Sequence, residues 1–189
     1  MAIICSDGSC KRNGKPDCIS SYGVVVYSNE GELLDTFAGS ELNSTSQRGE
    51  LYGMLKALKV GLEYNGGDVF IVTDSAYIAN CINGKWYEKW QRVGWITVEG
   101  TAVKNKDIWE QIVWVLKQYR TDSLFVYLIK GHIKMTDETS VKDAVQKFAA
   151  NNNGVVPPLD IFYMMLKGNA LADEVASSYV KEKDKEVQA

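Results

Sequence analysis

The chain has 189 residues, which is long enough for one domain with its own hydrophobic core. Its 46% hydrophobic and 24% charged residues are the proportions of a globular protein in water, and no apolar run reaches membrane-spanning length. A net charge of −3 excludes a protein that is basic over its whole surface, so any binding of nucleic acid must depend on a local patch.

The first part of the chain predicts three strands and a helix. Apolar, β-rich runs predict strands over 2–7, 21–27 and 33–38, connected by a polar loop at 11–16 and a hairpin turn at 29–31. This order predicts an antiparallel three-stranded meander. Ser44, Thr45 and Ser46 are candidate N-caps for a helix whose apolar face carries Leu51, Met54, Leu55, Leu58 and Leu62.

Strands and helices alternate in the next part. The pattern predicts a strand at 69–73, a short helix at 74–83, a tryptophan-rich segment at 85–95, a helix at 105–119 and a strand at 123–129. Together with the meander, this order favours an α/β fold in which helices pack on a central, mixed, five-stranded sheet.

Four carboxylates lie on separate predicted elements. Asp7 and Asp74 each end an apolar strand, and Glu50 and Asp173 each lie near the start of an amphipathic helix. Mg²⁺ prefers oxygen ligands, so rigid elements that each deliver one carboxylate suit a site for hard divalent cations. His132 is the only histidine, and it is the obvious titrating group near neutral pH.

Five motifs follow one another in a recognisable order, and they are Asp7-Gly8-Ser9, Arg48-Gly49-Glu50, Thr73-Asp74-Ser75, the Val103–Trp109 segment and Lys130-Gly131-His132. With these motifs the chain resembles the type 1 ribonuclease H family from about Ile3 to Tyr179. The resemblance implies a ribonuclease H-like fold. It also implies an endonuclease that cuts the RNA strand of RNA–DNA hybrids into 5′-phosphate and 3′-hydroxyl products.

The resemblance also implies a catalytic centre with two Mg²⁺ ions, for which Mn²⁺ would substitute. Asp7 would bridge the two ions, Glu50 and Asp74 would hold one of them, and Asp173 would hold the other. His132 would assist proton movement or product departure without binding metal.

Substrate contacts are implied in the same way. The backbone at Gly8, Ser9 and Cys10, together with the side chains of Asn13, Ser46 and Gln47, would face the minor groove of the hybrid, where 2′-hydroxyls distinguish RNA. Thr45 and Asn105 match positions that hold a DNA phosphate, although helix capping explains their spacing equally well.

A basic segment resembles the projecting element that grips the DNA strand in this family. It interleaves Lys85, Lys89 and Arg92 with Trp86 and Trp90. Residues 84–106 contain five basic and two acidic residues, a local charge of +3, and would make binding fall with salt. We expect the tryptophans both to pack and to support the projection.

The chain departs from the family pattern after His132, because 40 residues separate it from Asp173. We expect an insertion at about 134–166, favouring a surface-packed helical insert, with a helix at about 139–150, over a lid or partner-docking element. Asp143, 11 residues after His132, is the alternative fourth carboxylate. Asp173 is favoured because Gly168-Asn169 precedes it and because an acid in a first helical turn suits the helix dipole.

Other classes of function are weighed against this one. A junction resolvase or transposase-type nuclease would share the fold, and an inactive hybrid-binding module would share the surface. We expect a single ribonuclease H domain over 1–189 with a charged tail at 181–189. It should be a monomer in the cytoplasm, with no membrane partner. Cys5, Cys10, Cys18 and Cys81 lack metal-site spacing, so reduced thiols are favoured over a zinc site or a disulfide framework.

Overall fold

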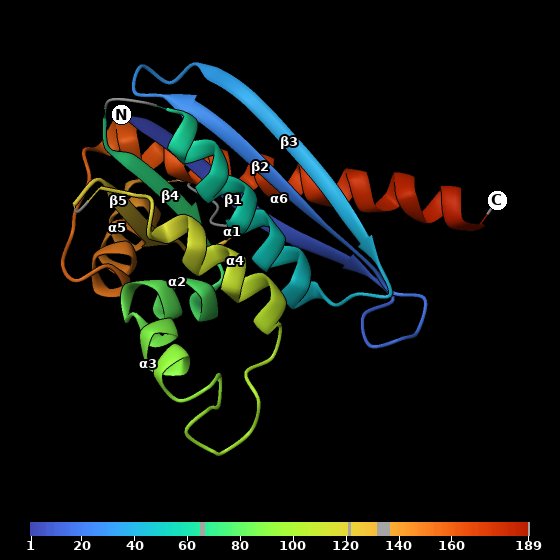
Figure 1. The fold of residues 1–189 in the computed structure, drawn as a ribbon. Coiled ribbons are helices and arrows are strands. Elements are labelled where there is room, and N and C mark those ends of the chain that lie inside the picture. The colour runs from blue at the N-terminus through green and yellow to red at the C-terminus, as the bar shows by residue number, and fades with distance from the viewer. Residues whose placement is uncertain (65–66, 121, 132–136, 189) are drawn as a thin grey trace.

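The computed structural model describes all residues except 65–66, 121, 132–136 and 189. Five strands within the described residues form one mixed sheet in the order β3-β2-β1-β4-β5 (Figure 1). The strands β1 (Ala2–Lys11), β2 (Ile19–Ser28) and β3 (Leu33–Leu42) pair antiparallel, and β4 (Val69–Thr73) and β5 (Leu124–Leu128) run parallel to β1. The predicted meander and the five-stranded mixed sheet are confirmed.

Helices cover both faces of this sheet. The described helices are α1 (Ser46–Glu63), α2 (Ala76–Asn83), α3 (Trp86–Arg92), α4 (Lys106–Leu116), α5 (Glu138–Asn151) and α6 (Leu159–Gln188). Helices α1 and α4 pack on one face, and α6 and α5 pack on the other (Figure 1). None of these described helices combines the length and the apolar composition needed to cross a lipid bilayer.

The central strands supply side chains to two separate cores. Along β1, Ala2 and Ile4 join the core beneath α1 and α4, whereas Ile3 and Cys5 join the core beneath α6 and α5. This alternation follows from the two-residue repeat of a strand. The strand that carries Asp7 is therefore buried on both faces and held rigidly.

β1 is longer than predicted. The sequence suggests that it ends at Asp7, but its pairing with β2 continues from Asp7 opposite Gly23 to Lys11 opposite Ile19. The hairpin provides partners for backbone groups that would otherwise lie unpaired beside a buried strand. Asp7 consequently lies within the strand and not at its end.

The last helix begins earlier than predicted. An insertion was expected to reach residue 166, but α6 is continuous from Leu159 to Gln188 and so includes both this apolar segment and the charged tail. Gly168 is buried inside α6, where a Cβ would collide with the Cys5 side chain. The small residue permits close packing on the sheet and does not start the helix. Asp173 therefore lies far from the helix N-terminus, and the prediction of a first-turn dipole effect is wrong.

Candidate active site

Two aspartates lie at matching positions on neighbouring parallel strands. β1 and β4 pair as far as Cys5 opposite Val72, and Asp7 and Asp74 each lie two residues further along. The carboxyl ends of adjacent parallel strands meet at one edge of a sheet, which is a common place for a functional site. Gly131 lies against Asp74, because a Cβ there would collide with the carboxylate.

That contact brings the beginning of the Lys130-Gly131-His132 motif to the same edge of the sheet. His132 itself lies outside the described residues. Its predicted role in proton movement or product departure therefore stays a prediction.

Glu50 reaches the site from α1. Thr45 caps this helix, as its Oγ1 accepts a hydrogen bond from the Arg48 backbone N at 3.3 Å. A Cβ at Gly8 would lie 2.5 Å from the Glu50 backbone N, so glycine lets α1 approach β1 closely. The Ser75 hydroxyl donates to Glu50 Oε2 at 2.6 Å, which connects the Glu50 carboxylate to the residue after Asp74.

Asp173 reaches the site from the opposite face of the sheet, on α6. Gly23 of β2 allows this approach, because a Cβ there would collide with the Ala172 carbonyl. One helical turn after Asp173, the Ser177 hydroxyl donates to Asp173 Oδ1 at 3.3 Å and lies 3.4 Å from Ser9 Oγ. The alternative acid, Asp143, is exposed on α5.

Asp7 lies in the electrostatic field of the other three acids. Its pKa is raised to about 7, first by burial, then by the charge of Asp74 and, to a smaller extent, by Asp173 and Glu50. The Gly8 backbone N–H, 2.6 Å from Asp7 Oδ1, acts in the opposite direction. Burial and Asp74 also raise the pKa of Glu50, against the hydrogen bond from Ser75. The structure thus brings Asp7, Glu50, Asp74 and Asp173 together.

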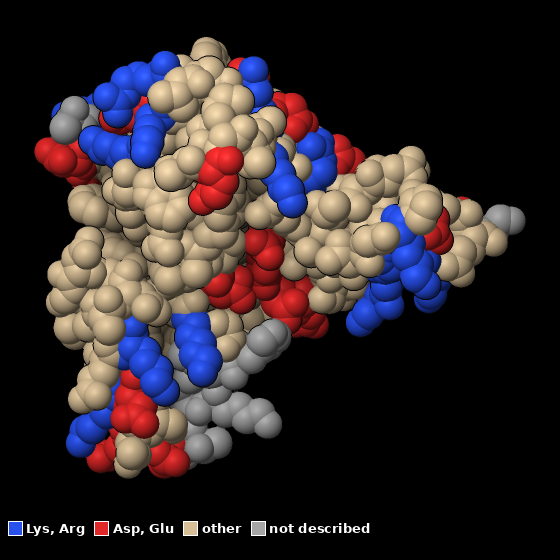
Figure 2. Space-filling model, turned by 90° about the horizontal axis from the view of Figure 1, so that it is seen from below, with Lys and Arg blue, Asp and Glu red and all other residues tan. Residues whose placement is uncertain are grey.

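The surface around the site is divided by charge. Figure 2 shows acidic side chains gathered near the centre of the face seen from below, with Lys and Arg side chains mostly toward its margins. Nucleic acid carries a negative backbone, so basic margins favour its approach whereas an acidic centre opposes it unless cations are present.

The donor set fits a hard divalent cation. All four acids offer carboxylate oxygens, and a cation between them would offset the repulsion that raises the pKa of Asp7. Within the described part of the chain, no three Asp, Glu, Cys or His side chains are arranged to hold a metal ion as they stand.

The residues predicted to face the minor groove lie beside the acids. Ser9 and Cys10 follow Asp7 along β1, and Asn13 lies on the next loop. The Asn13 side chain bonds to the start of α1 in both directions, donating to Ser46 Oγ at 3.2 Å and accepting from the Ser46 backbone N at 3.3 Å. The loop and the helix start therefore form one surface beside the acids.

The predicted phosphate contacts differ in their local role. Thr45 is an N-cap, as the capping interpretation requires. Asn105 precedes α4 with a left-handed backbone (φ 56°), but among the described residues its side chain makes no capping hydrogen bond. Instead its Nδ2 donates to Gln47 Oε1 at 3.0 Å, which connects the start of α4 to the start of α1.

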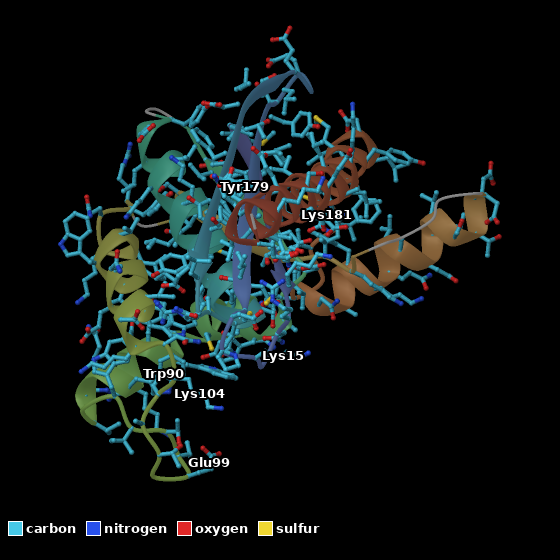
Figure 3. The ribbon with its side chains drawn as sticks, turned by 90° about the vertical axis from the view of Figure 1, so that its right-hand side faces the viewer. Lys15, Trp90, Glu99, Lys104, Tyr179 and Lys181 are labelled. Atoms are coloured by element: carbon cyan, nitrogen blue, oxygen red, sulfur yellow. The ribbon has the colours of Figure 1, made fainter. Side chains whose placement is uncertain are left out.

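The basic segment projects below the sheet. In Figure 3, Trp90 lies at the base of this projection and Glu99 at its far end. Trp90 is buried, with its ring centroid 5.5 Å from that of Trp109, whereas Trp86 is 47% exposed. Packing therefore anchors one tryptophan and leaves the other at the surface.

A groove of about 830 Å³ connects the projection with the start of α1. Its lining includes Gln47, Trp86 and the cationic side chains of Lys85, Lys89, Arg92 and Lys104. All five residues predicted for the basic segment thus line this groove, and the buried Trp90 forms part of its wall.

Several supporting residues were not predicted. Ser75 belongs to a quoted motif without an assigned role, and Ser177 lies four residues after Asp173, a spacing that places side chains together on a helix. Arg48 bonds to Glu41 at 2.7 Å and to Asp107 at 2.8 Å, which ties α1 to β3 and α4. The spacing of Ser177 from Asp173 was a local signal that could have been used, whereas the pairs Ser75–Glu50 and Arg48–Asp107 are remote in sequence and offered none.

Comparisons with known proteins identify the family. The family model described as RNase H matches residues 1–151. Ribonuclease H of Syntrophomonas wolfei is 35% identical over 130 residues, covering 69% of this chain and 83% of the relative. Ribonuclease H of Clostridium botulinum is 33% identical with the same coverage of each chain. The chain belongs to the RNase H family.

Solved structures show the same fold. The solution structure of the PFV RNase H domain matches with a TM-score of 0.67 at 22% identity, covering 94% of this chain and 92% of that one. LC11-RNase H1 in complex with RNA/DNA hybrid matches with a TM-score of 0.53 at 18% identity, covering 78% and 98%. The family model ends at residue 151, before Asp173, whereas the first structural match extends into α6.

Proposed function

We propose that this protein is an endonuclease that hydrolyses the RNA strand of RNA–DNA hybrids, leaving 5′-phosphate and 3′-hydroxyl ends. The convergence of four carboxylates, from β1, α1, α6 and the residue after β4, carries the proposal. Burial and the charges of the other three acids together raise the pKa of Asp7 to about 7. Membership of the RNase H family supports the same activity.

Asp7, Glu50, Asp74 and Asp173 would hold two Mg²⁺ ions, for which Mn²⁺ would substitute. When bound, such ions stabilise the charge that develops in phosphodiester displacement and lower the pKa of water. The chain itself positions the ligands: Ser75 holds Glu50, and Ser177 holds Asp173. His132 is proposed to assist proton movement.

The β1 surface and the groove would each bind one strand of the hybrid. Gly8, Ser9, Cys10 and Asn13, with Ser46 and Gln47, would contact the RNA strand and its 2′-hydroxyls. Lys85, Trp86, Lys89 and Arg92, with Thr45 and Asn105, would hold phosphates of the DNA strand, and Trp90 would anchor the projection. Contacts of this kind read backbone and groove shape, so little preference for base sequence is expected.

We further propose that residues 1–189 act as one monomeric domain. Its four free thiols suit a reducing compartment such as the cytoplasm. The described residues 137–158 would then belong to an insert packed beside the sheet, which ends earlier than the sequence predicts because 159–166 belong to α6.

A cleavage assay tests the proposed function. Labelled RNA–DNA hybrid, duplex RNA, duplex DNA and a four-way DNA junction are incubated with the protein in Mg²⁺ and in EDTA. Cleavage of the RNA strand of the hybrid alone, and only with Mg²⁺, is expected. Cutting of the junction would indicate a resolvase, and hybrid binding without any cutting would indicate an inactive binding module.

A further inference from the structure

Two cysteines lie face to face beside the proposed site. Cys10 near the end of β1 and Cys18 just before β2 are eight residues apart in sequence, and their Sγ atoms lie 2.7 Å apart. Both are free thiols. Two unbonded sulfur atoms do not normally approach so closely, and a disulfide needs a separation of about 2.0 Å. A small shift of either side chain would therefore join them.

The distance between the two sulfur atoms is too short for two thiolates bound to one metal ion. Two thiolates on a tetrahedral zinc ion, with Zn–S distances of about 2.3 Å, would lie well over 3 Å apart. No metal-holding group that includes these thiols occurs among the described residues. The geometry is closer to that of a disulfide than to that of a metal site.

Access to the two thiols differs. Cys18 is completely buried, whereas Cys10 is partly exposed. An oxidant from solution must therefore react first at Cys10, and Cys18 is placed to complete the bond from inside. Cys5 and Cys81 are also completely buried and have no neighbouring thiol placed in this way.

The loop between the two cysteines belongs to the substrate surface. It carries Asn13, which bonds to Ser46, and Arg12, which pairs with Asp17 and with Asp184 of α6. Lys15 marks this loop in Figure 3, toward the same lower side of the molecule as Lys104. A bond at the base of the loop would restrict its movement without displacing Asp7, which lies three residues earlier in β1.

We propose that Cys10 and Cys18 are a redox-sensitive pair that forms a reversible disulfide and fixes the loop at 11–17. With a small-molecule disulfide such as oxidised glutathione, the Cys10 thiolate attacks one sulfur and one glutathione thiol leaves. The Cys18 thiolate then attacks the Cys10 sulfur of the mixed disulfide, and the second glutathione thiol leaves. The protein loses two electrons and two protons, which reduce the glutathione disulfide to two thiols.

The protonation of Cys10 limits how fast the pair can react. Burial and the Cys18 thiol raise the pKa of Cys10 to about 12, so little Cys10 thiolate is present near neutral pH. Disulfide formation should consequently be slow near neutral pH and become faster as the pH rises.

The test treats the folded, full-length protein with oxidised glutathione, blocks the remaining thiols and measures intact mass and peptide linkage. Loss of two of the four thiols, a Cys10–Cys18 linked peptide and no retained glutathione are expected. Cys18→Ser should instead retain one glutathione at Cys10, and Cys10→Ser should not react. Cys81→Ala, which keeps the pair, should behave as the wild type does.

Physical readouts complete the test. The oxidised protein should unfold at a Tm about 5–10 °C higher than the reduced protein, and hydrogen exchange in the loop should slow. Treated Cys18→Ser should show neither change. Equal blocking of Cys10 and Cys18 after treatment, or loss of Cys5 and Cys81 thiols in their place, would overturn the inference. None of these measurements depends on nuclease activity, so the proposed function is tested separately.

Discussion

Asp7 is the residue on which the proposed chemistry converges. It lies in a strand buried on both faces, and three other acids act on it from three other elements. Its pKa of about 7 lies above the value of 3.8 that an unperturbed aspartate has. The folded protein therefore binds more protons than the unfolded chain between about pH 4 and pH 7, and ionisation of Asp7 lowers stability as pH rises through this window.

Asp7→Asn should separate stability from activity. Without metal at pH 7.5, the variant should have a free energy of unfolding about 1–2 kcal/mol higher than the wild type, because it removes a charge that is buried and repelled by Asp74. Its hybrid cleavage in Mg²⁺ should be nearly abolished. Thermal unfolding in EDTA across pH 4.5–8 should show the advantage of the variant growing up to about pH 7 and then levelling. A constant difference across this range would contradict the electrostatic argument.

Single substitutions can also test which residue is the fourth carboxylate. Asp173→Asn should reduce the cleavage rate by a large factor, about a hundredfold or more, because the charge of Asp173 acts on Asp7 and would help to hold the metal ions. Asp143→Asn is the matched control, as this acid is exposed on α5, and its rate should be close to that of the wild type. Single-turnover cleavage of the hybrid measures both. The reverse ranking would assign the fourth position to Asp143 and make α6 an appendage to the site.

Among the elements, α6 and the basic projection supply charged side chains to the site from outside the sheet. α6 packs across β1 and β2 only because Gly168 and Gly23 leave room for its backbone. The projection is held by the buried Trp90, while its cations line the groove. One element delivers an acid to the centre and the other delivers positive charge to the margin.

Gly23→Ala should test the approach of α6. The new Cβ would collide with the Ala172 carbonyl, a backbone atom that cannot move alone, so the helix must shift. Stability should fall by about 1–3 kcal/mol and cleavage should weaken, because Asp173 moves with the helix. Denaturant unfolding and cleavage rates provide the two measurements. Wild-type values for both would show that the helix position is not critical.

Replacement of Lys85, Lys89 and Arg92 with Ala should weaken hybrid binding and flatten its dependence on salt. The slope of log affinity against log salt should become less steep by up to about 2–3, since each phosphate contact contributes about 0.9. Turnover of bound substrate should change little, because these side chains lie away from the acids. Binding titrations at several salt concentrations measure the effect.

A control with the same change in charge removes Lys142, Lys147 and Lys181, which are exposed on α5 and α6. This variant should keep most of the wild-type salt slope. If both triple variants lost the same slope, net charge and not the projection would explain the binding.

At the scale of the whole molecule, an acidic protein presents a basic groove beside an acidic centre. The formal charge of −3 combines with a local charge of +3 over residues 84–106. Strands and helices from both faces of the sheet bring four carboxylates together. Their mutual repulsion raises the free energy of the folded state, and a divalent cation would offset this repulsion. Cation binding and folding should therefore be linked.

Mg²⁺ should stabilise the folded protein at neutral pH. At ten times its dissociation constant, a ligand that binds only the folded state adds about 1.4 kcal/mol, which corresponds to a Tm increase of a few degrees. Asp7→Asn should lose most of this increase. Thermal unfolding with Mg²⁺, compared with NaCl of equal ionic strength, provides the test, and equal Tm values in the two salts would argue against metal binding by the four acids.

The sequence by itself determined the elements and most of the candidate acids. Alternating apolar residues, turn residues and caps act over short distances, so they predicted the meander, α1, α5 and the five-stranded sheet. The positions of Asp7, Glu50 and Asp74 followed in the same way, because each lies next to the end or the start of a strongly patterned element.

Tertiary structure alone decided what depends on contacts between remote segments. The pairing of residues 8–11 with β2 extended β1, and α6 continues through Gly168, which packs against Cys5. The placement of Asp173 beside Asp7, and of Cys10 against Cys18, likewise depends on how elements pack in space. Local sequence patterns record the preferences of a segment, whereas these contacts depend on the partner that the folded chain supplies.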